Sequence, residues 1–148
     1  MKKCTLGLGC FWGPEENFKN KPGIIDTEVG YAGGHNPIVS YEEVRKGSTG
    51  HAEVVRLTFD EKIISFKKIL DLFFKMHDPT QKDMQFPDIG TQYRSEIFYE
   101  DEDQKKEAKE VLEILNKELN GKIQTNISQL KNYCKAEEYH QRYFEKNR

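Results

Sequence analysis

Residues 3–16 read KCTLGLGCFWGPEE, and this stretch combines a short apolar strand, a glycine turn and the start of a helix. Residues 3–8 alternate in polarity, which is typical of a half-buried strand. Pro14 suits the first turn of a helix, where no amide donor is needed, and the two glutamates after it favour a helix N-terminus. We expect the helix to end near Lys21, because a Pro-Gly pair follows.

Similar patterns continue along the chain. We expect further strands over residues 25–31, 52–59, 94–99 and 123–127, and further helices over 65–76, 101–119 and 136–146. The polar loop that ends near residue 50 is longer than most connections, which makes it a candidate functional surface. The order βαββαβαβα predicts an α+β fold with two layers, in which helices cover a ferredoxin-like mixed or antiparallel sheet.

Length and composition limit the class of protein. The 148 residues are the size of one ordinary domain, so we expect residues 1–148 to form a single domain. Lysine and arginine total 23 against 25 acidic residues, and this net charge of −2 favours neither nucleic acid nor an anionic membrane as a partner. The three cysteines do not suggest an extracellular disulfide framework. No apolar run approaches the roughly 20 residues that span a bilayer, and we expect a cytoplasmic monomer.

Cys10 is the first candidate functional residue, because it lies between the end of a strand and the start of a helix. Free amide donors and the helix dipole stabilise a thiolate at such a position, and the thiolate is the form that attacks. The alternative is a small buried residue in a tight turn. Phe11 and Trp12 favour the functional interpretation, because two large aromatic side chains after a turn are costly to expose unless they line a pocket.

Glu53 is the second candidate, because the alternation of residues 52–59 places it on the apolar face of the expected strand. Loss of solvation raises the pKa of a carboxyl group, and a protonated carboxyl group is a proton donor near neutral pH. The alternative places Glu53 at the rim of the core, with Arg56 or a backbone amide as its partner. The pattern alone slightly favours that alternative.

Five blocks of sequence resemble the signature blocks of one enzyme family. They are GCFWG at 9–13, GYAGG at 30–34, GHAE at 50–53, GTQYRS at 90–95 and AEEYHQ at 136–141. Together they are similar to peptide methionine sulfoxide reductases of the A class, which reduce the S epimer of the sulfoxide. The resemblance extends over nearly the whole chain, and it implies one catalytic domain that acts on methionine sulfoxide, free or within peptides and oxidised proteins.

The resemblance assigns roles to individual residues. It implies that Cys10 is the nucleophile and Glu53 the acid, in agreement with the argument from pKa. It implies that Phe11 and Trp12 hold the S-methyl group. Further substrate-binding or oxygen-binding positions are Tyr41, Asp88, Tyr93 and, as a weaker candidate, His140. For the last three, an ordinary structural role stays open: a satisfied half-buried side chain for Tyr93 and His140, and a turn cap for Asp88.

The chemistry requires such residue types. A sulfoxide sulfur is a weak electrophile, so attack by a thiolate needs protonation of the oxygen, which Glu53 would supply. Tyrosine hydroxyls can stabilise the same oxygen as it gains charge, and an indole face favours the positive sulfur. The product is methionine, with a sulfenic acid on Cys10. We expect no bound cofactor and no metal.

Two features depart from the family pattern. Many members carry recycling cysteines in a glycine-rich tail, whereas this sequence ends at Asn147-Arg148. The resolving candidate is Cys134; otherwise an external thiol reductant, such as thioredoxin, glutaredoxin or glutathione, must act on the sulfenic acid. The second departure is the segment MQFP at 84–87, where the family usually has a polar segment that contains glycine. The native residue at position 10 is either cysteine or selenocysteine.

Three other functions fit parts of the sequence. A cysteine hydrolase would pair Cys10 with one of the four histidines, which are His35, His51, His77 and His140. A zinc deaminase is suggested by the His-Ala-Glu at 51–53, but its Pro-Cys-x-x-Cys partner motif is absent from the sequence. The alternative from a different class is a non-catalytic module that binds methionine-containing peptides in an aromatic pocket.

Overall fold

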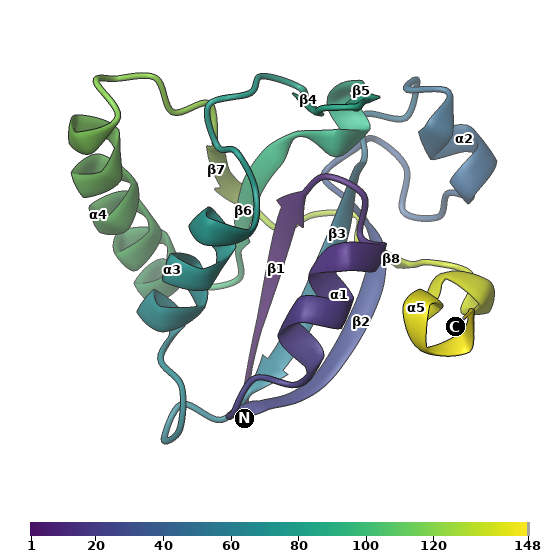
Figure 1. Cartoon of the computed structure of the whole chain (residues 1–148). Coiled ribbons are helices and arrows are strands. Elements are labelled where there is room, and N and C mark those ends of the chain that lie inside the picture. The colour runs from purple at the N-terminus through teal and green to yellow at the C-terminus, as the bar shows by residue number, and fades with distance from the viewer. Residues whose placement is uncertain (148) are drawn as a thin grey trace.

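The computed structural model describes residues 1–147 and contains a central sheet with helices packed on it (Figure 1). The elements in chain order are β1 (Lys2–Leu8), α1 (Trp12–Lys19), β2 (Ile24–Ala32), α2 (Tyr41–Arg45), β3 (Ala52–Phe59), α3 (Phe66–Met76), β4 (Met84–Gln85), β5 (Asp88–Ile89), the 3-10 turn η1 (Thr91–Tyr93), β6 (Ser95–Tyr99), α4 (Glu102–Glu118), β7 (Asn126–Gln129), β8 (Cys134–Lys135), the 3-10 turn η2 (Glu138–His140) and α5 (Tyr143–Lys146).

The six strands of the main sheet lie in the order β7-β6-β1-β3-β2-β8. All neighbours are antiparallel except β6 and β7, which are parallel. Its four inner strands follow the ferredoxin-like order, because the first strand lies between the third and the fourth of the βαββαβ unit. The predicted α+β class is confirmed.

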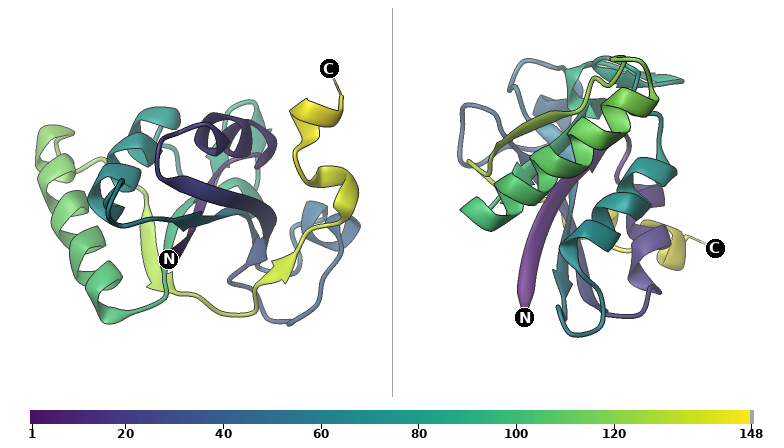
Figure 2. Two further views of the ribbon diagram at one scale, coloured as in Figure 1. Left: turned by 90° about the horizontal axis from the view of Figure 1, so that it is seen from below. Right: turned by 90° about the vertical axis from the view of Figure 1, so that its left-hand side faces the viewer.

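The main core lies between the sheet and the helices α1 and α3, which pack on the same face (Figure 2). Phe18 of α1 and Phe73 of α3 are completely buried there, together with Leu6 of β1 and Leu57 of β3. A smaller cluster lies apart from it and includes Val54 and residues of the segment before β8. The apolar faces that the sequence predicted for the inner strands therefore form one continuous layer with the helices.

Most predicted elements are confirmed within one or two residues, but three parts of the prediction were wrong. The last strand starts at Asn126 rather than near residue 123. The expected helix over 136–146 is divided into η2 and α5. Gln141 causes the break, because its side chain both accepts from and donates to the backbone of Val29 in β2, at 2.9 and 2.8 Å, and Arg142 then takes a left-handed conformation with φ 50°.

The third error concerns the long loop that ends near residue 50, which contains α2. Ser40 and Glu43 form a capping box at its start, in which each side chain bonds to the other residue's backbone N–H. The sequence also did not predict the short hairpin β4–β5 or the edge strand β8. None of the helices among residues 1–147 is long and apolar enough to span a membrane.

Candidate active site

Cys10 occupies the turn between β1 and α1, as the sequence predicted. Gly9 before it has φ 95°, a conformation that favours glycine, and a Cβ there would lie 3.0 Å from Cβ of Gln85 in β4. Burial raises the pKa of the Cys10 thiol to about 12, although a hydrogen bond from the backbone N–H of Trp12 opposes the shift. The expected lowering of this pKa was therefore wrong, because loss of solvation outweighs the amide at the helix N-terminus.

Glu53 lies beside this turn on β3, which is the direct neighbour of β1 in the sheet. Its side chain is only 2% exposed, and its Oε1 accepts a hydrogen bond from the backbone N–H of Phe11 at 3.3 Å. Burial raises the pKa of Glu53 to about 8, and the charge of Asp88 adds to the shift. Arg56 is not its partner, because the guanidinium group of Arg56 binds Glu100 at 2.6 Å. Glu53 is therefore a protonated carboxyl group at neutral pH.

Tyr41 and Tyr93 lie within electrostatic range of both reactive groups. Burial, followed by the charge of Glu53, raises the pKa of each phenol, and the value for Tyr93 is about 12. Cys10 contributes to both shifts. Both phenols therefore keep their protons at neutral pH and can donate hydrogen bonds. Asp88, in β5, acts electrostatically on Cys10, Glu53 and Tyr93, so this predicted residue also belongs to the cluster.

The aromatic residues Phe11 and Trp12 differ in burial. Phe11 is 1% exposed and packs with Tyr31 and His140, at centroid distances of 5.7 and 5.1 Å. Trp12 is half-buried and stacks on Tyr143 of α5, with ring centroids 3.7 Å apart and an interplanar angle of 5°. Trp12 is thus the more accessible of the two rings, and Phe11 supports it from the core side.

His140 is buried and lies in η2 rather than in the expected helix. Its Nδ1 accepts a hydrogen bond from Nε1 of Trp12 at 3.0 Å. Its ring packs on Tyr41 at a centroid distance of 4.6 Å. Within residues 1–147, Nε2 of His140 has no hydrogen-bond partner. The histidine therefore belongs to the aromatic cluster, and its tautomer carries the proton on Nε2.

Glu137 is a site residue that the sequence analysis missed. Its carboxylate accepts from the hydroxyl group of Tyr31 at 2.7 Å and from the backbone N–H of Tyr41 at 2.8 Å. Hydrogen bonds from these groups lower its pKa although burial opposes the shift. Glu137 thus ties the start of α2, with its candidate Tyr41, to the sheet. Glu137 lies inside the AEEYHQ block, which was the signal that could have found it. Tyr143, which stacks on Trp12, lies outside the five blocks, and the sequence gives no such signal for it.

The remaining cysteines lie outside this cluster. Cys4 is buried in the core of the sheet, as its position in the strand pattern predicted. Cys134 pairs with Tyr31, which in turn pairs with Glu53, so the three residues form a row across β8, β2 and β3. Its Sγ lies 3.6 Å from the carbonyl oxygen of Val39. Tyr31 therefore lies between Cys134 and Glu53 in the sheet.

The other enzyme classes find no support in this geometry. The groups that shift the pKa of Cys10 are Trp12, Glu53 and Asp88, and no histidine is among them for the part of the chain that is described. His51 and His77 instead bond to the carbonyl oxygen of Asn132 and to the Ser95 hydroxyl group. Residues 1–147 contain no group of three or more His, Cys, Asp or Glu side chains arranged to hold a metal ion.

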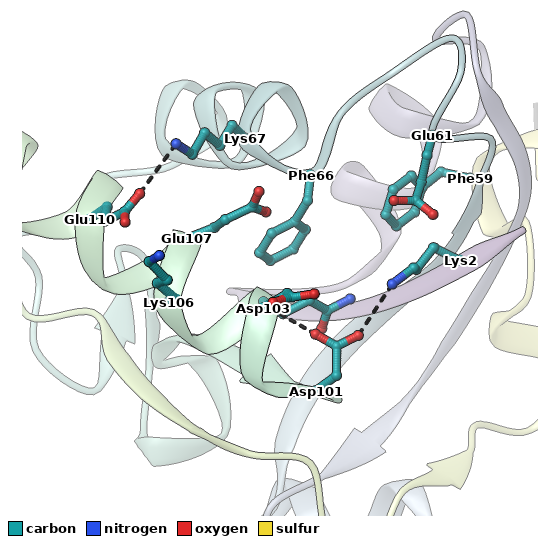
Figure 3. Close-up of a pocket in the computed structure, with 11 residues that line it drawn as sticks. Lys2, Phe59, Glu61, Phe66, Lys67, Asp101, Asp103, Lys106, Glu107 and Glu110 are labelled. Carbon is teal, nitrogen blue, oxygen red and sulfur yellow. Dashed lines mark hydrogen bonds and ion pairs between the residues drawn. The ribbon is translucent and has the colours of Figure 1, made fainter.

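A separate hollow lies at the opposite end of β1 and does not belong to the cluster around Cys10 (Figure 3). It measures about 460 Å³ and lies between the start of β1 and the helix α4. Charged side chains line it, and two ion pairs cross it, Lys2 with Asp101 at 3.5 Å and Lys67 with Glu110 at 3.2 Å. None of the predicted site residues lines it.

The fold and the cluster, in which a half-buried cysteine lies beside a buried carboxyl group with a raised pKa, define the class as a thiol enzyme. Comparison with known proteins identifies the family. A family model described as peptide methionine sulfoxide reductase matches residues 2–148. The chain therefore belongs to the peptide methionine sulfoxide reductase family, as its sequence blocks predicted.

Individual relatives agree with this assignment. The peptide methionine sulfoxide reductase MsrA of Pelagibacter ubique is 58% identical over 146 residues, which cover 99% of each chain. Mxr1 of Saccharomyces cerevisiae in its reduced form superposes with a TM-score of 0.94 at 40% identity, over 99% of this chain and 85% of that one. Mxr1 in complex with Trx2 gives a TM-score of 0.69 at 30% identity, over 94% and 83% of the two chains.

Proposed function

We propose that Cys10 reduces methionine S-sulfoxide, with Glu53 as the proton donor. Reduction of methionine sulfoxide is the activity of the family to which the chain belongs. The observation that carries the residue assignment is Glu53, because a carboxyl group that is 2% exposed and has a pKa of about 8 holds its proton beside the nucleophile. Choice of the S epimer rests on the similarity to proteins named MsrA.

The reaction transfers one oxygen atom. Cys10 loses its proton as it attacks the sulfoxide sulfur, and Glu53 protonates the sulfoxide oxygen. The oxygen then passes to the Cys10 sulfur. Its bond to the substrate sulfur and the sulfur–sulfur bond formed by the attack both break, which leaves a sulfenic acid on Cys10. The substrate sulfur gains two electrons and Cys10 loses two. The proton that Cys10 released replaces the one that Glu53 gave, so the net change is the movement of oxygen alone.

The high pKa of Cys10 gives the substrate a role in activation. The thiol holds its proton at neutral pH chiefly because burial raises its pKa, and the nearby carboxyl groups of Glu53 and Asp88 add to the shift. A sulfoxide oxygen that accepts hydrogen bonds from Tyr41 and Tyr93 develops negative charge, while its sulfur becomes more positive. We propose that this polarisation makes the substrate sulfur electrophilic enough for Cys10 to attack it. The Cys10 thiol then loses its proton during the attack rather than before it.

Trp12 and Phe11 are proposed to hold the S-methyl group. The indole of Trp12 is half-buried, and its contacts with Tyr143 and His140 hold its orientation. A face of indole attracts a positive sulfur by roughly 0.5–2 kcal/mol. The protonated sulfoxide is therefore favoured over the neutral sulfide product, which helps methionine to leave.

We propose that an external thiol regenerates Cys10. The chain resembles Mxr1 in a complex with Trx2, which supports a reductant of the thioredoxin type. In the sheet, β3 and β2 lie between β1, after which Cys10 follows, and β8, which carries Cys134, and strands three positions apart are about 14 Å apart. A disulfide requires Cα atoms within about 7 Å. Cys134 would thus have to leave β8 before it could act as a resolving cysteine.

The biological role follows from this chemistry. We propose that the protein is a single-domain, monomeric repair enzyme that reverses methionine oxidation in peptides and proteins under oxidative stress. The three cysteines are free thiols, and regeneration consumes reduced thiols, both of which support a reducing compartment such as the cytoplasm. No bound cofactor is needed, since the electrons come from Cys10 itself.

A single turnover without reductant tests the proposal. The wild-type enzyme is mixed with an excess of methionine S-sulfoxide, and dimedone is added to trap sulfenic acid. We expect close to one methionine per enzyme and a dimedone adduct on the peptide that contains Cys10. Cys134→Ser is the matched control and should give the same adduct. An adduct confined to another cysteine, or no methionine formed, would reject the proposed nucleophile.

A further inference from the structure

The hairpin β4–β5 exposes two large apolar side chains. Phe86 is 75% exposed and Ile89 is 69% exposed. They lie in and beside the MQFP segment at residues 84–87. Neighbouring aromatic and aliphatic side chains that are exposed to water often mark an interaction site. The hairpin therefore carries exposed apolar surface that the catalytic residues do not explain.

Hydrogen bonds at the base of the hairpin hold it in a defined position. The side chain of Gln85 accepts from the backbone N–H of Asp78 at 3.0 Å and donates to its carbonyl oxygen at 2.6 Å. The backbone N–H of Phe86 donates to Oε1 of Gln81 at 2.7 Å. Phe86 is therefore presented to solvent by an ordered backbone, which reduces the entropy cost of binding to it.

The hairpin lies directly beside the nucleophile. Figure 1 shows it above the end of β1, after which Cys10 follows. Gln85 packs on Gly9, where a Cβ would meet it at 3.0 Å. Asp88, between the two apolar residues, acts electrostatically on both Cys10 and Glu53. Chain that continues from a methionine sulfoxide bound at Cys10 would therefore reach the hairpin within a few residues.

A third large side chain, Tyr139, is exposed on another element next to the site. Tyr139 in η2 is 57% exposed, and its ring centroid lies 4.2 Å from that of His140. It also acts electrostatically on Tyr41. Apolar surface is thus available on the hairpin and on η2, and both elements contact residues of the candidate active site.

We propose that Phe86, Ile89 and Tyr139 form a docking surface for apolar side chains that flank methionine sulfoxide in an unfolded polypeptide. The inference rests on the proposed function and specifies its substrate class. The occupant is the substrate chain itself, because its sulfoxide is bound at Cys10 and its neighbours must lie on the adjoining surface. Methionines are core residues, so the segments that carry them are rich in apolar neighbours, and these become accessible when oxidation disrupts packing.

The experiment compares matched substrates with dithiothreitol as reductant. The substrates are free methionine S-sulfoxide, a pentapeptide with leucines on both sides of the sulfoxide and a pentapeptide with serines there. The kcat/KM of each peptide is first divided by that of the free amino acid. The ratio compared between variants is then the value for the leucine peptide over the value for the serine peptide. For the wild type we expect the leucine peptide to exceed the serine peptide by about tenfold, from partial burial of two side chains. In Phe86→Ser/Ile89→Ser the ratio should fall toward one, and in Tyr139→Ser it should fall in part.

Ile63→Ser is the control, since Ile63 is 60% exposed but lies after β3, at the end away from Glu53. It should keep the wild-type ratio. Equal use of the two peptides by the wild type, or an unchanged ratio in the hairpin variant, would overturn the inference while leaving turnover of the free sulfoxide as evidence for the proposed function. An effect that appears only when thioredoxin replaces dithiothreitol would also overturn it, because the surface would then serve the reductant.

Discussion

Nε1 of Trp12 donates a hydrogen bond to Nδ1 of His140 at 3.0 Å, across 128 positions of the sequence. The bond requires Nδ1 to be unprotonated, so His140 must be neutral. Burial lowers the pKa of His140, although Glu137 nearby opposes the shift. The C-terminal segment thus orients the indole that we propose to face the substrate. Trp12 is the single tryptophan of the chain, so its fluorescence reports this contact directly.

Replacing His140 should release Trp12. His140→Phe keeps a ring but removes the acceptor, so we expect a shifted indole emission in the free enzyme and about a tenfold lower kcat/KM. His140→Asn, whose side-chain oxygen can lie near the former Nδ1, should restore part of both signals. In the wild type, emission should change only as pH falls below the usual histidine range. Wild-type emission and kinetics in His140→Phe would show that the bond does not position the indole.

Glu53→Gln should bind substrate but reduce it slowly, because the amide keeps the shape and has no acidic proton. We expect kcat to fall by about a hundredfold or more, with a small change in KM. Wild-type kcat should decline as pH rises through about 8, where the carboxyl group loses its proton. The decline should be absent in the variant. Steady-state rates between pH 6 and about 10 measure both effects; unchanged kcat in Glu53→Gln would remove the residue from the mechanism.

The same carboxyl group should make folding stability depend on pH. Its pKa is 4.5 when the group is freely solvated, as in the unfolded chain, and about 8 in the folded protein, so the folded state binds more protons between these values. Stability from this group is therefore complete below about 4.5 and is lost as pH rises through about 8. We expect Glu53→Gln to gain stability relative to the wild type as pH increases. Urea unfolding of both proteins at low and high pH tests this; a difference that is constant with pH would contradict the buried, protonated carboxyl group.

Cys134→Ser should leave turnover intact with dithiothreitol, because Cys134 is held in β8 beside Tyr31. If an external thiol attacks the sulfenic acid directly, turnover with glutaredoxin and glutathione should also be unchanged. Dithiothreitol, glutaredoxin with glutathione, and thioredoxin are each tested on both proteins. A selective loss with thioredoxin alone would instead assign Cys134 as the resolving cysteine and would require β8 to open.

The sequence predicted the elements whose burial pattern is simple. Residues 52–59 alternate regularly, and β3 covers that same range, with Glu53 on the buried face. Family blocks then connected Cys10 with Glu53, which lie 43 positions apart in the chain but share the contact at Phe11. Local patterns and family motifs were therefore sufficient for the central sheet and the reactive pair.

Features that depend on tertiary contacts could not be predicted. The apolar and charged pattern of 136–146 suits a helix, yet the side chain of Gln141 bonds to the backbone of Val29 and interrupts it. The pKa of Cys10 depends on how deeply the turn is buried, which local sequence does not reveal. The capping box at Ser40 is the exception, since Ser40 and Glu43 have the S-x-x-E spacing that predicts the start of a helix, and α2 begins there.

The most direct test of the central claim is consumption of the two epimers of methionine sulfoxide with dithiothreitol, by the wild type and by Cys10→Ser. The account predicts that the wild type removes only the S epimer and that the serine variant removes neither. Consumption of the S epimer by Cys10→Ser, or no consumption by the wild type, would contradict it; in the latter case a module that only binds methionine-containing peptides would explain the aromatic cluster instead.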